Sequence, residues 1–319
     1  MNAADEVASV TVLRNVDRMG ERATPGLGGR HEGSGPRASL LLQLRRHPRV
    51  RGWGVIAMAA AWLGVLVVVA VTAQWLPIPK PGIGIGTPNQ APHWGREFLG
   101  TDGAGRSMLS RIVFGTRISL LIACVATAGS AVIGGVVGLL SAYFGSVVRL
   151  VGEIIANTLL SIPGLLLGIF IVLVFGTSVP VIMVGCGLVF VAQFVRLTRA
   201  NASRELALGY VRAARGLGAS SRRIIFRELL PNVWPGLISY VSLVIPSVII
   251  LAGGLSFLGY GVQSPTPDLG NMIAAGAQEL QTTPWPAIVP CVVLVITVFA
   301  LITIGDYLRV RLAPRGSAE

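Results

Sequence analysis

The chain has 319 residues, of which 53% are hydrophobic and only 13% are charged. This composition is too apolar for an ordinary soluble domain and indicates a membrane protein. The formal net charge of +12 would suit a nucleic-acid-binding surface, but the arginines cluster at the ends of apolar segments rather than along one face. Membrane orientation explains that distribution better, so nucleic acid is not expected as a partner.

The residue types that chemistry needs are scarce. The single lysine, Lys80, cannot complete a G-x-x-x-x-G-K-[ST] phosphate loop. If ATP drives the protein, another chain therefore binds the ATP and its Mg²⁺, and no cofactor is expected on this one. Cys124, Cys186 and Cys291 lie in three different apolar runs, which predicts small buried thiols rather than metal ligands. No catalytic or metal-binding residue is predicted.

The N-terminal part predicts a tail and one membrane span. Residues 1–40 lack apolar periodicity, which is typical of disorder. The uncharged run 52–76 exceeds the roughly 20 residues that a spanning helix needs. A basic cluster precedes this run and predicts a cytoplasmic N-terminus. The cluster consists of Arg45, Arg46, Arg49 and Arg51.

The segment 77–117 is rich in proline and glycine and predicts an outer loop. Within it, residues 101–106 (TDGAGR) offer one carboxylate without further ligands, so we expect a structural turn rather than a metal or phosphate site. A short amphipathic helix should follow, because Met108, Leu109, Ile112 and Val113 recur at helical spacing.

Five further apolar runs predict spans, at residues 118–144, 153–175, 179–195, 233–258 and 287–305. Pro163 and Pro246 should kink the third and fifth spans of the chain. Residues 259–286 are expected to form an outer loop with a partly re-entrant or interfacial segment.

The small residues and the polar residues inside these spans can each be interpreted in two ways. Ser130, Gly134 and Gly138 repeat every four residues and allow close approach of a helix, either from this chain or from a partner. Polar side chains at depth face protein or water rather than lipid. They either line a translocation path or make ordinary interhelical hydrogen bonds; the candidates are Asn157, Thr158, Ser161, Gln193 and Ser242.

The segment 204–235 organises the chain, since it carries six arginines and two glutamates between two apolar runs. Its first half predicts a helix, on the spacing of Leu206, Tyr210, Ala213, Ala214 and Leu217. Residues 216–218 (GLG) should break that helix. A second helix, capped by Ser220 or Ser221, would bury apolar residues, turn arginines outward and end at Pro231 and Pro235. The apolar set is Ile224, Ile225 and Leu229; the outward set is Arg222, Arg223 and Arg227.

Three stretches carry a resemblance to a known family. Residues 210–218 (YVRAARGLG), followed by an apolar-basic helix ending in LLPN at 229–232, resemble the EAA loop of ABC-importer permeases. Residues 99–111 (LGTDGAGRSMLSR) and 255–267 (LSFLGYGVQSPTP), with GNM at 270–272, are similar to the C-type permease of dipeptide and oligopeptide importers. Arg212 departs from the pattern, because the loop's namesake glutamate would stand there.

The resemblance implies an all-α type I importer permease with six transmembrane helices and a cytoplasmic helix-turn-helix coupling loop. That loop would dock into a cleft on a separate ATPase through Tyr210, Arg212, Ala213, Ala214, Arg215, Gly218, Ala219 and Pro231. The implied partners are a B-type permease, two ATPase chains, an extracytoplasmic binding protein and membrane lipid. Short peptides are the implied cargo, although related permeases carry nickel chelates and other small solutes.

The expected organisation is a tail at 1–40, a first span with its outer loop at 41–100, a permease core at 101–315 containing the coupling loop 204–235, and a tail at 316–319. The location implied is the bacterial inner (plasma) membrane. Beyond the first tail, 16 basic residues fall on the proposed inner side and five on the outer side. That bias predicts six spans with both termini cytoplasmic.

Two rival classes fit less well. A self-contained secondary transporter usually needs buried ionisable groups, and the one clear candidate, Glu153, is expected to pair with a nearby arginine. An intramembrane hydrolase would need a histidine or second acid in the bilayer. His31, His47 and His93 all lie outside the predicted spans.

The charge bias can be tested by labelling. In a variant without native cysteines, single cysteines at Asn89 and Thr266 should react in intact cells with an impermeant thiol reagent. Cysteines at Ser221 and Ser317 should react only after the cells are opened. Labelling of position 221 from outside would reverse the predicted orientation.

Overall fold

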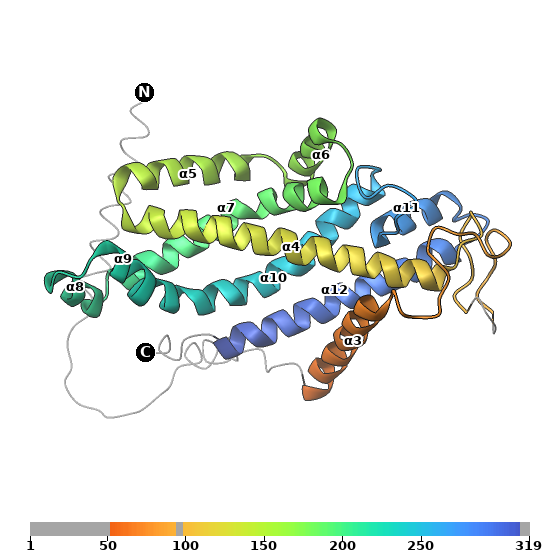
Figure 1. Cartoon of the computed structure of the whole chain (residues 1–319), viewed down its shortest axis with the longest axis horizontal. Coiled ribbons are helices and arrows are strands. Elements are labelled where there is room, and N and C mark those ends of the chain that lie inside the picture. The colour runs from red at the N-terminus through yellow and green to blue at the C-terminus, as the bar shows by residue number, and fades with distance from the viewer. Residues whose placement is uncertain (1–51, 94–97, 313–319) are drawn as a thin grey trace, which may run out of the picture. The chain divides into compact units, whose positions relative to one another are not determined.

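The computed structural model describes residues 52–93 and 98–312. The predicted tails and the basic cluster at 45–51 lie outside this part of the chain. The described residues are almost entirely helical (Figure 1). They contain five helices long and apolar enough to cross a membrane, or six spans if one bent helix pair is counted as a span. The predicted all-α polytopic fold is confirmed.

The spanning helices follow the apolar runs with shifted ends. They are α3 (Trp53–Thr72), α4 (Met108–Tyr143), the bent pair α5 (Ser146–Ser161) and α6 (Gly164–Phe175), α7 (Val179–Leu206), α10 (Leu230–Phe257) and α12 (Trp285–Leu312). Between α10 and α12, the predicted outer segment contains the short helix α11 (Leu269–Gln278), whose first turn is capped by the side chain of Asp268.

One boundary prediction is wrong. The expected amphipathic helix near residue 108 and the second span form one uninterrupted helix of 36 residues, α4. The expected boundary lay at the start of the apolar run 118–144, after Arg111 and Arg117. Arg111, however, is only 2% exposed, because its guanidinium pairs with the carboxylate of Asp102 at 3.3 Å. A buried arginine that pairs with a carboxylate can lie within a buried helical segment.

The contact between α4 and α7 is the most extensive in the bundle, and the two helices lie side by side in Figure 1. A β-carbon added at Gly134 would lie 2.7 Å from the carbonyl oxygen of Val191, and one at Gly138 would lie 2.6 Å from that of Val195. The hydroxyl of Ser130 donates to the carbonyl of Gly187 at 2.6 Å. The small-residue repeat therefore serves packing within this chain, which was one of the two interpretations.

The kink expected at Pro163 is a full break. Helix α5 ends at Ser161, α6 begins at Gly164, and the two axes differ by 92°. Pro163 has an extended backbone (φ −53°, ψ 128°) before α6. Proline has no backbone N–H and so cannot continue the hydrogen bonding of α5. By contrast, Pro246 lies inside the continuous helix α10.

The prediction for the cysteines holds for one of three. Cys186 on α7 is fully buried in the core, whereas Cys124 on α4 and Cys291 on α12 are exposed. An apolar run does not reveal which of its faces points outward, since lipid is as apolar as a protein core. That is why the sequence could not separate the three thiols.

The α4–α7 contact yields a stability prediction. Gly134→Ala should destabilise the bundle by about 1–3 kcal/mol, because the added methyl group overpacks the interface. Gly129→Ala, on the same helix, is the matched control, since a β-carbon there meets no described atom within 4 Å. Thermal inactivation of the purified protein measures both; equal loss in the two variants would contradict this account of the interface.

Candidate functional site

The segment after α7 forms the predicted hairpin, although its first helix is broken. Helix α7 ends at Leu206, and α8 (Gly209–Gly216) begins after an extended residue, Leu208 (φ −74°, ψ 149°). The prediction of one continuous helix from 204 to 217 is therefore wrong. Val211 is the buried residue of α8, so the hairpin turns this one side chain into the bundle. The spacing that suggested a continuous helix belongs largely to exposed residues, such as Tyr210 (40%) and Leu217 (89%).

The turn itself matches the prediction. Helix α8 ends at Gly216, and Gly218 has a positive φ of 80°. Ser220 caps the next helix, its hydroxyl accepting from the backbone N–H of Arg223. In that helix Ile224, Ile225 and Leu229 are buried, while Arg222, Arg223 and Arg227 are exposed, as expected. The hairpin thus holds to the bundle by an apolar face and presents arginines outward.

The expected helix end at Pro231 and Pro235 is wrong. Helix α9 (Ser221–Arg223), the π-helical η1 (Ile224–Leu229) and α10 form one apolar helix of 37 residues. The N–H of Leu230 bonds to the carbonyl of Ile225, one residue farther back than in an α-helix. This wider turn immediately precedes Pro231. In a regular α-helix the proline would remove one backbone hydrogen bond, and its ring would clash with the carbonyl of the preceding turn. The hairpin is therefore continuous with a spanning helix.

Hydrogen bonds of Tyr210 join three elements of the hairpin. Its hydroxyl donates to Glu205 Oε2 at 2.7 Å, at the end of α7, and accepts from Asn232 Nδ2 at 3.0 Å, at the start of α10. Partial burial and the Glu205 carboxylate raise the pKa of Tyr210 to about 12, so the phenol keeps its proton and remains a donor. The sequence pointed to Tyr210 but not to Glu205 and Asn232 as its partners, because no sequence pattern predicts these hydrogen bonds.

Most of the other predicted coupling residues lie on or beside α8, and Pro231 lies at the start of α10. Arg212 donates to the carbonyl of Ala207 at 2.6 Å, and Arg215 stacks over the ring of Tyr143, 5.5 Å from its centroid. Ala213 is exposed, while Ala214 and Ala219 are half-buried. Their docking role remains a prediction.

The predicted pathway residues separate into two groups. Gln193 accepts from the hydroxyl of Tyr240 at 2.6 Å, and Ser242 donates to carbonyls of Ser239 and Gly305; these bonds tie α7, α10 and α12 together. Asn157, Thr158 and Ser161 are instead exposed on α5. Their role in translocation remains a prediction.

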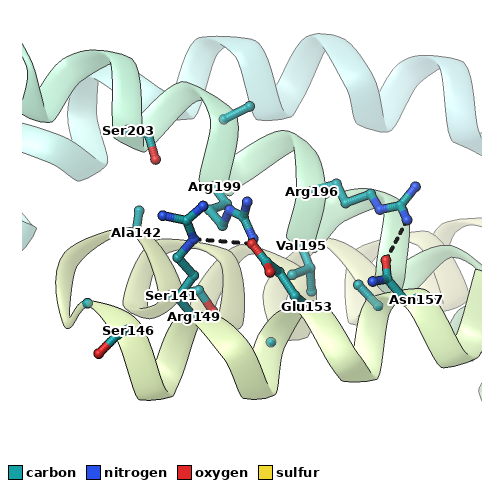
Figure 2. A pocket seen from close by; sticks show the side chains of 14 residues that line it. Ser141, Ala142, Ser146, Arg149, Glu153, Asn157, Val195, Arg196, Arg199 and Ser203 are labelled. Atoms are coloured by element: carbon teal, nitrogen blue, oxygen red, sulfur yellow. Dashed lines mark hydrogen bonds and ion pairs between the residues drawn. The ribbon is translucent and has the colours of Figure 1, made fainter.

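A cavity of about 740 Å³ lies between α4, α5 and α7, near the coupling hairpin. Figure 2 shows that its polar side chains point toward one another across the gap between α5 and α7. Glu153 Oε1 accepts from Arg149 Nε at 3.2 Å and also pairs with Arg199 Nη1, while Arg196 donates to Asn157 Oδ1 at 2.7 Å. The expected arginine partner of Glu153 is thus confirmed, and there are two.

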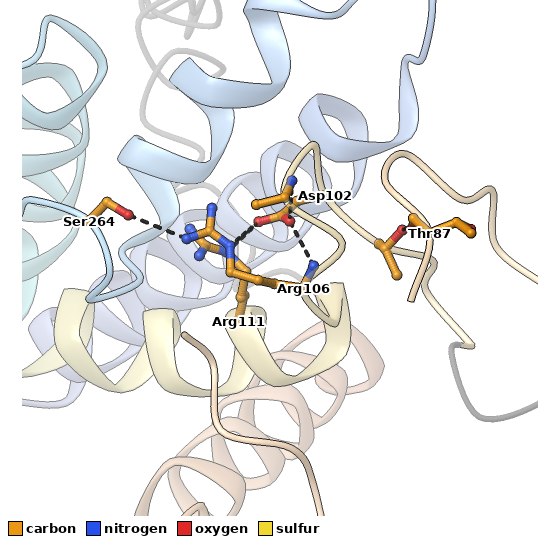
Figure 3. A network of polar contacts seen from close by, with 7 residues as sticks. Thr87, Asp102, Arg106, Arg111 and Ser264 are labelled. Carbon is orange, nitrogen blue, oxygen red and sulfur yellow. Dashed lines mark hydrogen bonds and ion pairs between the residues drawn. The ribbon is translucent and has the colours of Figure 1, made fainter. Parts of the chain in front are cut away.

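At the other end of α4, Asp102 organises the predicted turn (Figure 3). Its Oδ1 accepts the backbone N–H groups of Ala104 (3.0 Å) and Arg106 (2.9 Å), and its Oδ2 pairs with the side chains of Arg106 and Arg111. Arg106 also donates to the hydroxyl of Ser264 at 3.3 Å. The carboxylate is fully used in fixing the loop, so the structural interpretation is confirmed.

Comparison with known proteins gives a consistent picture. Residues 134–317 match the model of the family described as binding-protein-dependent transport system inner membrane component. The chain is 33% identical to the dipeptide transport system permease protein DppC of Alkalihalophilus pseudofirmus and 34% identical to the glutathione transport system permease protein GsiD of Pectobacterium atrosepticum. Each match covers 70% of this chain and 73% of the relative. An inward-facing structure of the MetNI methionine ABC transporter shares the fold, with a TM-score of 0.53 at 22% identity, over 65% of this chain and 98% of that one.

The positive φ of Gly218 gives a test of the hairpin. Gly218→Val should strain the turn by about 1–3 kcal/mol and weaken co-purification of the ATPase that the resemblance implies, at normal membrane levels. The strain comes from the backbone alone, because no described atom lies within 4 Å of an added β-carbon.

The matched control is Gly216→Val. An added β-carbon at Gly216 also meets open space among the described residues, and its φ is not positive. Loss of ATPase binding in both variants would show that the added side-chain bulk, rather than backbone strain at Gly218, causes the effect.

Proposed function

We propose a function that starts from one established premise: this chain belongs to the family of binding-protein-dependent transport system inner membrane components. It is a multi-pass permease subunit of an ABC importer. On our proposal it forms half of a translocation pathway, and a second, B-type permease chain forms the other half. An extracytoplasmic binding protein delivers the cargo to the pair.

The observation that carries the proposal is the hairpin 207–229. It is buried on one side and exposes arginines and the apolar side chain of Leu217 (89%) on the other. A single exposed leucine does not by itself mark a contact, but together with the exposed arginines around it the hairpin offers an apolar anchor and a charged rim of the kind that interfaces use. We propose that α8 inserts Leu217 into a cleft on a cytoplasmic ATPase, with two such ATPases per transporter supplying the sites for ATP and Mg²⁺.

Energy would then be transmitted mechanically. The hairpin is continuous with α10 and is tied to α7 through Tyr210 and Glu205. When ATP closes the two ATPases, the hairpin moves with them and biases the permease pair toward its outward-facing state. This is a population shift driven by differential binding, so this chain needs no nucleotide site of its own.

Short peptides are the proposed cargo. The names of the two relatives reported above specify dipeptides and glutathione. Both are small peptides with free carboxylates, so the proposal covers this class rather than one compound. The proposed setting is the bacterial plasma membrane, with both termini and the hairpin in the cytoplasm.

Reconstitution tests the proposal. The complete complex, reconstituted in proteoliposomes, consists of this chain, the second permease and the ATPases. It should take up a radiolabelled tripeptide when ATP is present on the ATPase side of the membrane and the loaded binding protein on the opposite side. Omitting this chain should abolish uptake, and the purified chain alone should show no saturable ATP binding. Peptide uptake by the remaining subunits, or ATP binding by this one, would contradict the proposal.

A further inference from the structure

The break between α5 and α6 leaves the end of α5 exposed. Helix α5 has 16 residues and is about 24 Å long, so its end at Ser161 falls within a hydrocarbon core about 30 Å thick. The last carbonyls of a helix lack helical partners, and lipid cannot satisfy them. Residues 161–163 are nonetheless exposed in this chain. Such backbone at depth must line a water-filled space or contact protein.

A polar flank leads from that break to the cavity. Arg149, Glu153, Asn157 and Ser161 follow one another at intervals of four residues, which aligns them along one side of α5. Figure 2 shows the first three of these positions on the cavity side, with Arg196 and Arg199 of α7 facing them. Asn157, one turn before Ser161, is the lining residue nearest to the break.

The cavity wall has an excess of positive charge. Three guanidinium groups line it, and Glu153 is the one carboxylate among the lining residues, which leaves a formal excess of +2. Each guanidinium has five N–H donors. Glu153 Oε1 accepts one contact from Arg149 and one from Arg199, and Asn157 Oδ1 accepts one from Arg196. Most of the guanidinium donors are therefore left for a ligand.

We propose that this cavity binds the carboxylate group of the cargo as it leaves the pathway, with Arg149 and Arg199 as its main ligands, and that it makes the permease favour acidic over basic peptides. A planar guanidinium pairs with a carboxylate through two parallel hydrogen bonds. The inference rests on the proposed peptide cargo. A lipid phosphate has similar chemistry, but a cavity of about 740 Å³ has the size of a small-molecule site and favours the cargo.

The test measures charge discrimination by the reconstituted complex in phosphatidylcholine vesicles. Maximal uptake rates of Ala-Ala-Glu and Ala-Ala-Lys are compared while the binding protein is saturated with either peptide. The wild type should favour the acidic peptide by about five-fold, the size of a partly exposed ion pair. Arg149→Gln and Arg199→Gln should bring the ratio toward one, and Arg149→Lys should restore part of it.

The control is Arg309→Gln, which removes an exposed arginine near the end of α12, outside the cavity, and should leave the ratio unchanged. The Arg199→Gln variant could fail to assemble because Glu153 loses a partner. In that case Arg149→Gln still tests the carboxylate site, since the Arg149 side chain is 61% exposed and contributes less packing.

The outcomes separate this inference from the proposed function. No uptake of any peptide by the wild type would contradict the proposed function itself. Uptake with the same ratio in the wild type and in Arg149→Gln would overturn the carboxylate site alone. An effect of the arginine variants that appears only when phosphatidylglycerol is added to the vesicles would identify a lipid phosphate as the ligand, and would also overturn it.

Discussion

The close packing of α4 against α7 is the contact on which the rest of the structure depends. In a membrane, helices gain little from hydrophobic burial, so their association relies on close approach and on interhelical hydrogen bonds. Gly134 and Gly138 let the α7 backbone approach α4, and Ser130 adds a hydrogen bond to the carbonyl of Gly187. Helices α5, α6 and α10 also pack on α7. The position of α7 therefore fixes both the cavity on one side and the hairpin at its end.

The hairpin is held by a second, smaller cluster of buried residues. Val211 of α8 packs with Ile224 and Leu229 of η1 against Leu139 of α4 and Ala202 of α7. These apolar contacts anchor the hairpin from beneath, while the hydrogen bonds of Tyr210 join its two ends to α7 and α10. A loop anchored in this way can transmit a displacement, because its backbone is continuous with one spanning helix and tied to the end of another.

Most of the fold was readable from the sequence because long apolar runs and turn residues act locally. The six runs and the turn at Gly218 depend on nearby residues, and so does the cap at Ser220. The errors concern longer-range effects. Arg111 could lie inside a spanning helix because Asp102 neutralises it, and Pro231 could lie inside a continuous helix because a π-turn precedes it. Likewise, the sequence named Asn157 and Glu153 separately, but only the packing of α5 on α7 brings them into one cavity with three arginines.

Helix α7 links that cavity to the proposed energy source. Arg196 and Arg199 lie ten and seven residues, respectively, before its end at Leu206, within about 15 Å along a helix. On the proposed mechanism, an ATPase that pulls on the hairpin displaces this end of α7 relative to α5. The contacts of Arg199 with Glu153 and of Arg196 with Asn157 cross that boundary, so on the proposed mechanism such a displacement changes how many guanidinium donors are free. The same motion that opens the pathway would therefore change its affinity for a carboxylate, which is what a transporter needs in order to release what it has carried.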